Sequence, residues 1–253
     1  TLKTFLPVAP DRLLVQNELM QEDAAYLDYP RKRVTIAGFP KFDMYTDHSV
    51  LLPREEFMQA LGLDPTKKLI VYAGAGTQLA LHDEEILADY IRAVEQGDIA
   101  GAPQVVVRPH PKYVYRAESI GARPFWVLDR PGEVVGGTLG EFEFSRTDVV
   151  HLMNTLYHMD LLVHTASTLG LEACIFDRPS ITIAYDGHAT VPPALSTARY
   201  YRYVHLERVL RTGGMPVAHT LAELVAQTNR YLADPSLDRA GRERIVKENA
   251  HTI

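Results

Sequence analysis

The chain has 253 residues, of which 46% are hydrophobic and 23% are charged, and its formal net charge is −6. This composition is typical of a folded protein with a sizeable core, and the acidic balance excludes a broad basic surface for nucleic acid or an anionic membrane. The single cysteine, Cys174, excludes an internal disulfide and fits a reducing compartment, so we expect a cytoplasmic protein. Because the sequence opens at Thr1 and not at methionine, we expect it to be part of a longer chain.

Short apolar runs alternate with amphipathic helical patterns along the whole sequence. The apolar runs predict strands at 12–16, 33–38, 67–76, 103–111, 124–130, 160–165, 178–185 and 203–208. The 3.6-residue patterns predict helices at 18–27, 53–63, 81–97, 145–159, 168–176 and 221–233. Local signals mark the ends of two of these helices, because Gly97 can close one and Ser145 or Thr147 can cap another.

This order of elements predicts an α/β fold of the Rossmann-like, doubly wound kind. Strands that are apolar on both faces and alternate with helices form a mostly parallel sheet that helices cover on both sides. Ligands bind to such sheets beyond the carboxyl ends of the strands. Four loops directly follow apolar strands, at 73–78, 108–113, 164–168 and 185–190. We therefore expect these loops to meet at one edge of the sheet.

The loop 164–168, with the sequence HTAST, leads into a helix that contains one acid, Glu172. With Ser167 or Thr168 as the cap, the following amides are left free and the helix dipole adds positive charge, which together make a phosphate site. A capping box would place its acid three residues after the cap, and Glu172 lies four residues after Thr168. Its carboxylate can accept hydrogen bonds from the two hydroxyls of a ribose, and the alternative is an acid that only complements the helix dipole. We count His164 among the candidate binding residues of this loop.

The loop 108–113 combines an arginine and a histidine with two prolines. Pro109 and Pro111 keep the backbone extended on both sides of His110. Arg108 can meet phosphate oxygens with a bidentate guanidinium fork, and His110 can donate to a phosphoryl oxygen or a leaving group. A histidine at a strand end can also be purely structural.

The other two loops carry weaker signals. Gly74, Gly76 and Thr77 lie in AGAGTQ, where glycines permit close approach of a ligand, but a plain tight turn explains them equally well. The segment lacks both the dinucleotide-binding spacing and the P-loop lysine. Asp186 follows a strand and precedes Gly187, and Asp-Gly is also a common turn pair. No histidine or acid has metal-ligand spacing, so we expect no metal and no other cofactor.

Two of these stretches together resemble a known family. The RPHP of 108–111 and DLLVHTASTLGLEACIFDRPSITIAYD of 160–186 are similar to the donor-binding half of GT-B-fold transferases, above all the CDP-glycerol glycerophosphotransferase group and related bacterial capsule and surface-polysaccharide enzymes. Segments 10–27 and 34–45 resemble the crossover between the two GT-B domains. The matching positions are Arg108, Pro109, His110, Pro111, Ser167, Thr168, Glu172, Asp177, Arg178, Pro179, Tyr185 and Asp186. Glu172 stands where the glycerophosphate group usually has Asp, and His164-Thr165 replaces its usual run, which favours a sugar transferase.

The resemblance implies a division of the chain and a set of roles. Residues 1–33 would be the end of an N-terminal acceptor domain with the crossover, and residues 34–253 the domain that binds the nucleotide donor. His110 would be the catalytic contact to the donor phosphates, Ser167 and Thr168 would bind the diphosphate, and Glu172 would hold the ribose.

The resemblance also implies the partners of the chain. These are a nucleotide-diphospho- or CMP-activated donor, an acceptor glycan or lipid-linked polymer for bacterial surface polysaccharide or teichoic-acid-like synthesis, and an N-terminal GT-B domain. Peripheral association with a membrane would involve parts outside this sequence. Without that N-terminal domain we expect the chain to bind donor and not to turn it over.

Two other classes of protein stay open at this point. A non-hydrolysing UDP-GlcNAc 2-epimerase shares the fold, although this chain lacks the Ser-Gly-Gly and Glu-Glu run of those isomerases. A non-catalytic nucleotide-binding module is the third hypothesis.

Overall fold

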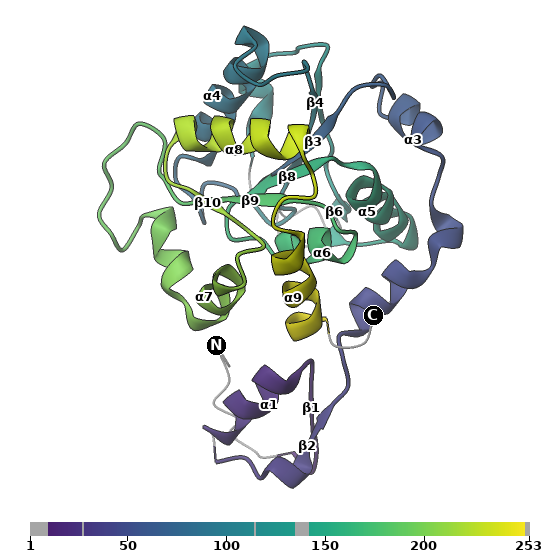
Figure 1. Ribbon diagram of the computed structural model, residues 1–253, viewed down its shortest axis with the longest axis vertical. Helices are drawn as coiled ribbons and strands as arrows, with labels where there is room; N and C mark the ends of the chain where they lie inside the picture. The colour runs from purple at the N-terminus through teal and green to yellow at the C-terminus, as the bar shows by residue number, and fades with distance from the viewer. Residues whose placement is uncertain (1–9, 27, 114, 135–141, 251–253) are drawn as a thin grey trace.

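A six-stranded sheet forms the centre of the computed structural model, which describes residues 10–26, 28–113, 115–134 and 142–250 (Figure 1). The order of its strands is β10-β9-β8-β3-β4-β5, and every pairing in it is parallel. The predicted parallel sheet is therefore confirmed. Its strands are β3 (Leu69–Gly74), β4 (Gln104–Pro109), β5 (Trp126–Leu128), β8 (Leu161–His164), β9 (Ser180–Ile183) and β10 (Val217–Ala218).

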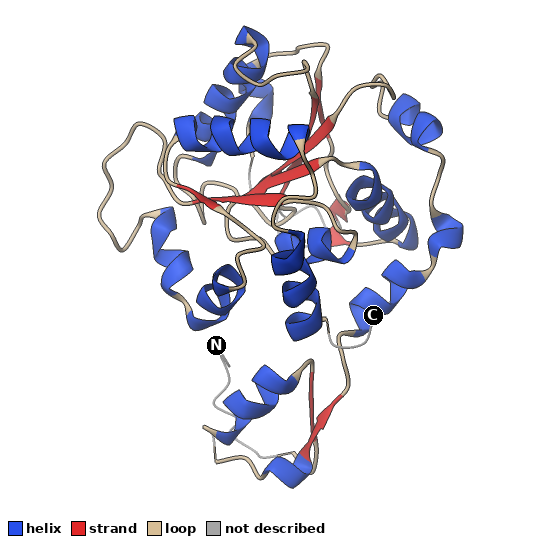
Figure 2. Ribbon diagram, in the orientation of Figure 1, coloured by secondary structure: helices blue, strands red, loops and turns tan. Residues whose placement is uncertain are grey.

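Helices cover both faces of this sheet, as the doubly wound pattern predicts (Figure 2). Successive residues of a strand point to opposite faces, so Ile70 and Tyr72 of β3 pack in one hydrophobic cluster and Val71 and Ala73 in the other. Helices α4 (Asp83–Gln96) and α8 (Leu221–Ala233) cover the first face. The second is covered by α3 (Arg54–Ala60), α5 (Arg146–His158) and α6 (Leu169–Ile175).

The first described residues form a small unit of their own. Strands β1 (Leu13–Val15) and β2 (Val34–Ile36) pair in parallel, with α1 (Glu18–Ala25) and a 3-10 turn, η1 (Arg31–Arg33), between them. This N-terminal unit has a separate hydrophobic cluster and lies below the main sheet in Figure 1. An ion pair of 3.4 Å between Arg208 and Asp23 links it to the rest. Residues 1–9 of the expected acceptor-domain tail, and position 27 of the first predicted helix, lie outside the described residues.

The remaining short elements connect these parts. They are α2 (Pro40–Asp43), η2 (Met44–Thr46), η3 (His48–Val50), η4 (Ala117–Ile120), β6 (Glu133–Val134), β7 (Phe142–Glu143), η5 (Thr197–Arg202), α7 (Val204–Arg211) and α9 (Arg239–Asn249). Local helix signals are confirmed, since Ser145 forms a capping box at α5 and Gly97 ends α4 with a φ of 81°.

The predicted strand at 203–208 is wrong, because this segment begins helix α7. Val209 is buried and Leu210 packs beside it in the same cluster. Leu206, Val209 and Leu210 have the i, i+3, i+4 spacing of a helix face, which a window ending at residue 208 cuts off. The last strand of the sheet is instead β10, a two-residue strand that starts at Val217.

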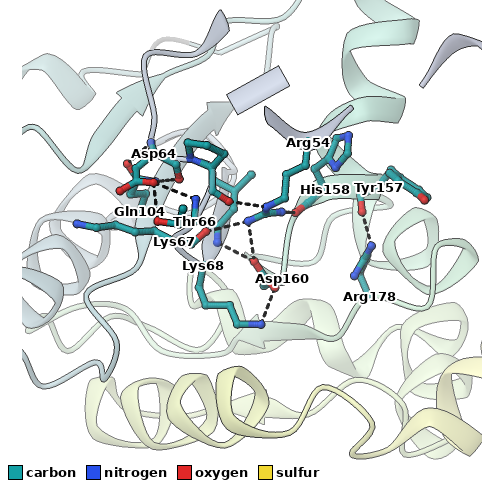
Figure 3. Close-up of polar contacts among 12 residues, drawn as sticks. Arg54, Asp64, Thr66, Lys67, Lys68, Gln104, Tyr157, His158, Asp160 and Arg178 are labelled. Atoms are coloured by element: carbon teal, nitrogen blue, oxygen red, sulfur yellow. Dashed lines mark hydrogen bonds and ion pairs between the residues drawn. The ribbon is translucent and has the colours of Figure 1, made fainter. Parts of the chain in front are cut away.

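A polar network closes the amino end of the sheet (Figure 3). Asp160, just before β8, accepts from the Leu69 amide of β3 at 2.8 Å and from Lys68 Nζ at 2.9 Å. Arg54, at the start of α3, reaches Asp160 at 3.3 Å and donates to the carbonyls of Pro65, Lys67 and His158. These contacts satisfy the first amide of β3 and the carbonyls of the connections that lead into β3 and β8.

We predict that Arg54→Met lowers the free energy of unfolding by about 2 kcal/mol, because several backbone acceptors lose a charged donor. Arg211→Met is the matched control, since Arg211 is 73% exposed and its ion pair with Glu207 lies on the surface. The control should change the free energy by less than about 0.5 kcal/mol in urea-induced unfolding. Equal effects of the two substitutions would contradict the prediction.

Candidate functional site

A cavity of about 390 Å³ opens at the carboxyl end of the sheet, opposite the network of Arg54. Its wall comes from the loops that follow β3, β4 and β8, together with Lys41, Pro131, Phe144 and Leu152. Three of the four loops predicted to converge therefore line one hollow, and the fourth, 185–190, does not line it. The volume lies in the range of small-molecule sites.

The predicted site residues divide into two groups. Those that line the cavity are Gly74, Arg108, His110, Ser167, Thr168 and Glu172. Those that lie outside its wall are Gly76, Thr77, His164 and Asp186.

His110 presents one ring nitrogen as a hydrogen-bond donor. Its Nδ1 accepts from the Lys112 amide at 3.2 Å, so the proton of the neutral ring is on Nε2. Burial and the nearby Lys112 charge lower the pKa of His110, which keeps the ring neutral at pH 7. The amide of His110 donates to the Gly74 carbonyl at 2.8 Å and fixes the backbone after β4. His110 can therefore donate to an acceptor oxygen in the cavity.

Arg108 is buried and already has an anionic partner. One of its terminal nitrogens donates to Asp129, and Asp129 also lies 3.1 Å from Nε2 of His151. Although burial acts in the opposite direction, His151 and Arg108 together hold the pKa of Asp129 below its usual value. A guanidinium has five N–H donors, so the pairing with Asp129 leaves others for a ligand and orients the group.

The loop 164–168 is held by hydrogen bonds within the protein. Ser167 donates its amide to Nδ1 of His164 at 3.1 Å, and its hydroxyl accepts from the Leu169 amide at 3.2 Å. The Gly170 amide donates to the Ser167 carbonyl. The expectation that the amides after the cap are free is thus wrong for Leu169 and Gly170, which donate to Ser167, and for Leu171, which donates to the Thr168 carbonyl at 3.0 Å. Thr168 occupies the cap position of α6 without a side-chain cap bond.

His164 lies beneath this loop and not in the cavity wall. Burial lowers its pKa to about 3, so the ring is neutral. A Cβ added at Gly170 would lie 2.6 Å from the His164 Nε2, so the two residues are in close contact. His164 orients the loop through Ser167.

The amides of the glycine loop after β3 are likewise engaged in hydrogen bonds within the protein. Asp83, at the start of α4, accepts from the Ala75 amide at 2.8 Å and from the Gly76 amide at 3.3 Å. Gly76 has a φ of +80°, and a Cβ there would lie 2.6 Å from the Tyr113 side chain. This turn and the neighbouring tyrosine therefore require glycine, which agrees with the tight-turn alternative of the sequence analysis.

The carboxylate of Asp186 is engaged in hydrogen bonds within the protein. It accepts from the Ser196 hydroxyl at 2.5 Å and from the Thr197 amide at 2.9 Å, where η5 begins. A turn does form here, since the Ala189 amide donates to the Asp186 carbonyl and Gly187 has a φ of 61°, but the carboxylate itself binds the start of η5.

Glu172 is the buried acid of the site, with 1% of its surface exposed. Lys41 Nζ lies 2.6 Å from Oε1, and the Tyr45 hydroxyl donates to Oε2. Burial and the adjacent Glu172 raise the pKa of Tyr45, so it remains a donor. Lys41, Tyr45 and Lys112 are not among the site residues predicted from the sequence. The only available signal for the first two was the resemblance of 34–45 to a domain crossover, since they are far from Glu172 in sequence.

Comparisons with known proteins place the fold. Neither a family model nor a curated protein matches the sequence. The wall teichoic acid polymerase TagF is similar in structure, with a TM-score of 0.57 and 16% identity over 95% of this chain and 54% of that one. A proposed UDP-N-acetylglucosamine 2-epimerase from Listeria monocytogenes matches with a TM-score of 0.61 and 12% identity, over 95% of this chain and 55% of that one.

A third similar structure is the UDP-GlcNAc 2-epimerase from Neisseria meningitidis bound to UDP-GlcNAc. Its TM-score is 0.55 and its identity 10%, over 94% of this chain and 60% of that one. The chain therefore has the Rossmann-like architecture of a GT-B fold. It spans a little over half the length of these structures.

Asp83 gives a prediction on the pH dependence of stability. Burial raises its pKa to about 6, above the value of about 3.9 in unfolded chains. The folded state binds this proton more tightly, so the contribution of Asp83 is fully present below about pH 4 and is lost as the pH rises through 6. We expect the free energy of unfolding of the wild type, minus that of Asp83→Asn, to fall by about 2 to 3 kcal/mol between pH 4 and pH 7. Urea titrations at several pH values measure it, and a difference independent of pH would refute the assignment.

Proposed function

We propose that this chain is the donor-binding part of a transferase that uses a nucleotide-activated donor. The observation that carries the proposal is that the loops after β4 and β8, together with helix α6, bring His110, Ser167, Thr168 and the buried Glu172 to one cavity. His110 and Lys112 suit the phosphates, and Glu172 suits the ribose hydroxyls. Similarity to TagF and to an epimerase bound to UDP-GlcNAc supports a nucleotide ligand.

In this proposal the chain stabilises the departing phosphate. The Nε2–H of His110 donates to a phosphoryl oxygen, and the nearby Lys112 ammonium adds positive charge. Arg108, oriented by Asp129, offers its remaining N–H groups. Such groups, fixed before the reaction, contribute roughly a few kcal/mol each when charge develops on the leaving group.

The acceptor and its catalytic base belong to the rest of the enzyme in this proposal. Residues 1–33 contain the end of an acceptor domain and the interdomain crossover, and residues 34–253 are the donor domain. The enzyme acts in the cytoplasm on bacterial surface polysaccharide or a teichoic-acid-like polymer. None of the helices among the described residues has the length and apolarity needed to cross a membrane.

Nucleotide binding tests the proposal directly. We expect CDP, UDP, CMP or GDP at 100 times its dissociation constant to stabilise the chain by about 2.7 kcal/mol. This corresponds to a rise in melting temperature of roughly 5 to 10 °C in differential scanning fluorimetry. A melting temperature unchanged by all four nucleotides would refute the proposal.

We predict that His110→Ala weakens the binding of the stabilising nucleotide by about tenfold, because one hydrogen bond to a charged oxygen is lost. His188→Ala is the control, since His188 lies outside the cavity and pairs with Asp89 at 2.9 Å. Isothermal titration calorimetry should show unchanged affinity for the control. Equal losses for the two variants would contradict the role of His110.

Measurements of turnover distinguish the transferase hypothesis from the epimerase hypothesis. We expect the chain to bind nucleotide and to show no transferase activity without the preceding part of its protein. The epimerase hypothesis is supported by two of the similar structures and predicts formation of ManNAc from UDP-GlcNAc by the longer protein. Tight binding without either reaction in the longer protein would indicate a non-catalytic module.

A further inference from the structure

Glu172, the acid of the cavity, is contacted by two side chains of the segment that connects the N-terminal unit to the sheet. Lys41 in α2 and Tyr45 in η2 both reach Glu172, across 131 and 127 residues of sequence. Tyr45 is 1% exposed and Lys41 is 41% exposed at the cavity wall. The two contacts engage different oxygens of the carboxylate, so both oxygens have a fixed donor.

The connecting segment itself is anchored by aromatic packing. The ring of Phe42 lies 4.6 Å from that of Phe39 and 5.8 Å from that of Tyr45, and Tyr45 lies 5.3 Å from Phe176 after α6. Phe42 and Tyr45 belong to the hydrophobic cluster on one face of the sheet. The backbone that carries Lys41 therefore has a defined position over Glu172.

The acceptor positions of Glu172 indicate what this carboxylate can still bind. An ionised carboxylate offers about four acceptor positions on its two oxygens. Lys41 takes one on Oε1 and Tyr45 takes one on Oε2, which leaves about one on each oxygen. A vicinal diol donates two hydrogen bonds from adjacent carbons and matches this remaining pair. Without Lys41, the buried carboxylate would lose its cationic partner.

We propose that Lys41 and Tyr45 are positioning residues that make the cavity selective for ribonucleotides over 2′-deoxyribonucleotides. This inference rests on the proposed nucleotide-binding function and adds the residues that orient Glu172 toward the ribose. It also makes nucleotide binding depend on the segment leading out of the N-terminal unit, because Lys41 follows β2 closely and β2 ends at Ile36.

The test compares the affinities of a ribonucleotide and its 2′-deoxy counterpart, with CDP against dCDP and UDP against dUDP as probes in isothermal titration calorimetry. We expect the wild-type chain to bind the ribonucleotide about tenfold more tightly or better, as a hydrogen bond to a charged group provides. Lys41→Met and Tyr45→Phe should lower this ratio at least about threefold, and Glu172→Gln should lower it as well. Lys41→Arg should retain it, because the cation is kept.

Lys112→Met is the matched control, because Lys112 is the other lysine in the cavity wall. It should weaken both nucleotides equally and leave the ratio unchanged. A ratio that Lys41→Met and Tyr45→Phe leave as in the wild type would overturn the inference while the proposed function stands. If neither CDP nor UDP binds the wild-type chain, both fail together.

The double variant Lys41→Met/Glu172→Gln keeps the test decisive if Lys41→Met alone does not fold, because it removes the buried charge together with its partner. Compared with Glu172→Gln, it should show no further loss of affinity if Lys41 acts through Glu172. A further, equal loss for both nucleotides would mean that Lys41 contacts the phosphates directly, and would overturn the positioning role.

Discussion

The central strands of this protein are buried on both faces, and the polar groups of the chain are arranged around that constraint. Alternate residues of β3 pack into two separate hydrophobic clusters, so neither face of the strand can carry a polar site. Unpaired backbone groups and polar side chains then gather at the strand ends. At the amino ends Arg54 and Asp160 close the sheet, and at the carboxyl ends the loops remain open around a cavity.

The charges of the cavity are largely paired within the protein. Arg108 is matched by Asp129, and Glu172 by Lys41. Pairing lowers the cost of burying these groups and fixes their orientation before a ligand arrives. In the proposed nucleotide site, such paired groups would recognise the hydrogen-bonding pattern of a ligand as well as its charge.

The proposed site depends on the part of the chain that precedes the sheet. The structures that resemble this chain are nearly twice as long as the part it matches, and β1, α1 and β2 form a unit with its own small core. Through Lys41, the segment that follows this unit contacts the acid of the cavity. The chemistry proposed for the site thus depends on the sheet and also on what precedes it.

The sequence by itself determined the alternation of strands and helices, the parallel sheet and the convergence of the loops after β3, β4 and β8, because these follow from local periodicity and from the direction of parallel strands. Periodicity near a segment end was less informative, as the helix that begins at Val204 shows. Only the tertiary structure decided which groups these side chains bind. Asp83 accepts from the Gly76 amide, Asp186 accepts from the Ser196 hydroxyl, and Lys41 and Tyr45 both donate to Glu172. The two contacts to Glu172 join residues 131 and 127 positions apart and leave no spacing in the sequence, because only the packing of the folded chain brings them together. The contacts of Asp83 and Asp186 are shorter in range but depend on how the loops after β3 and β9 fold back onto the start of a helix.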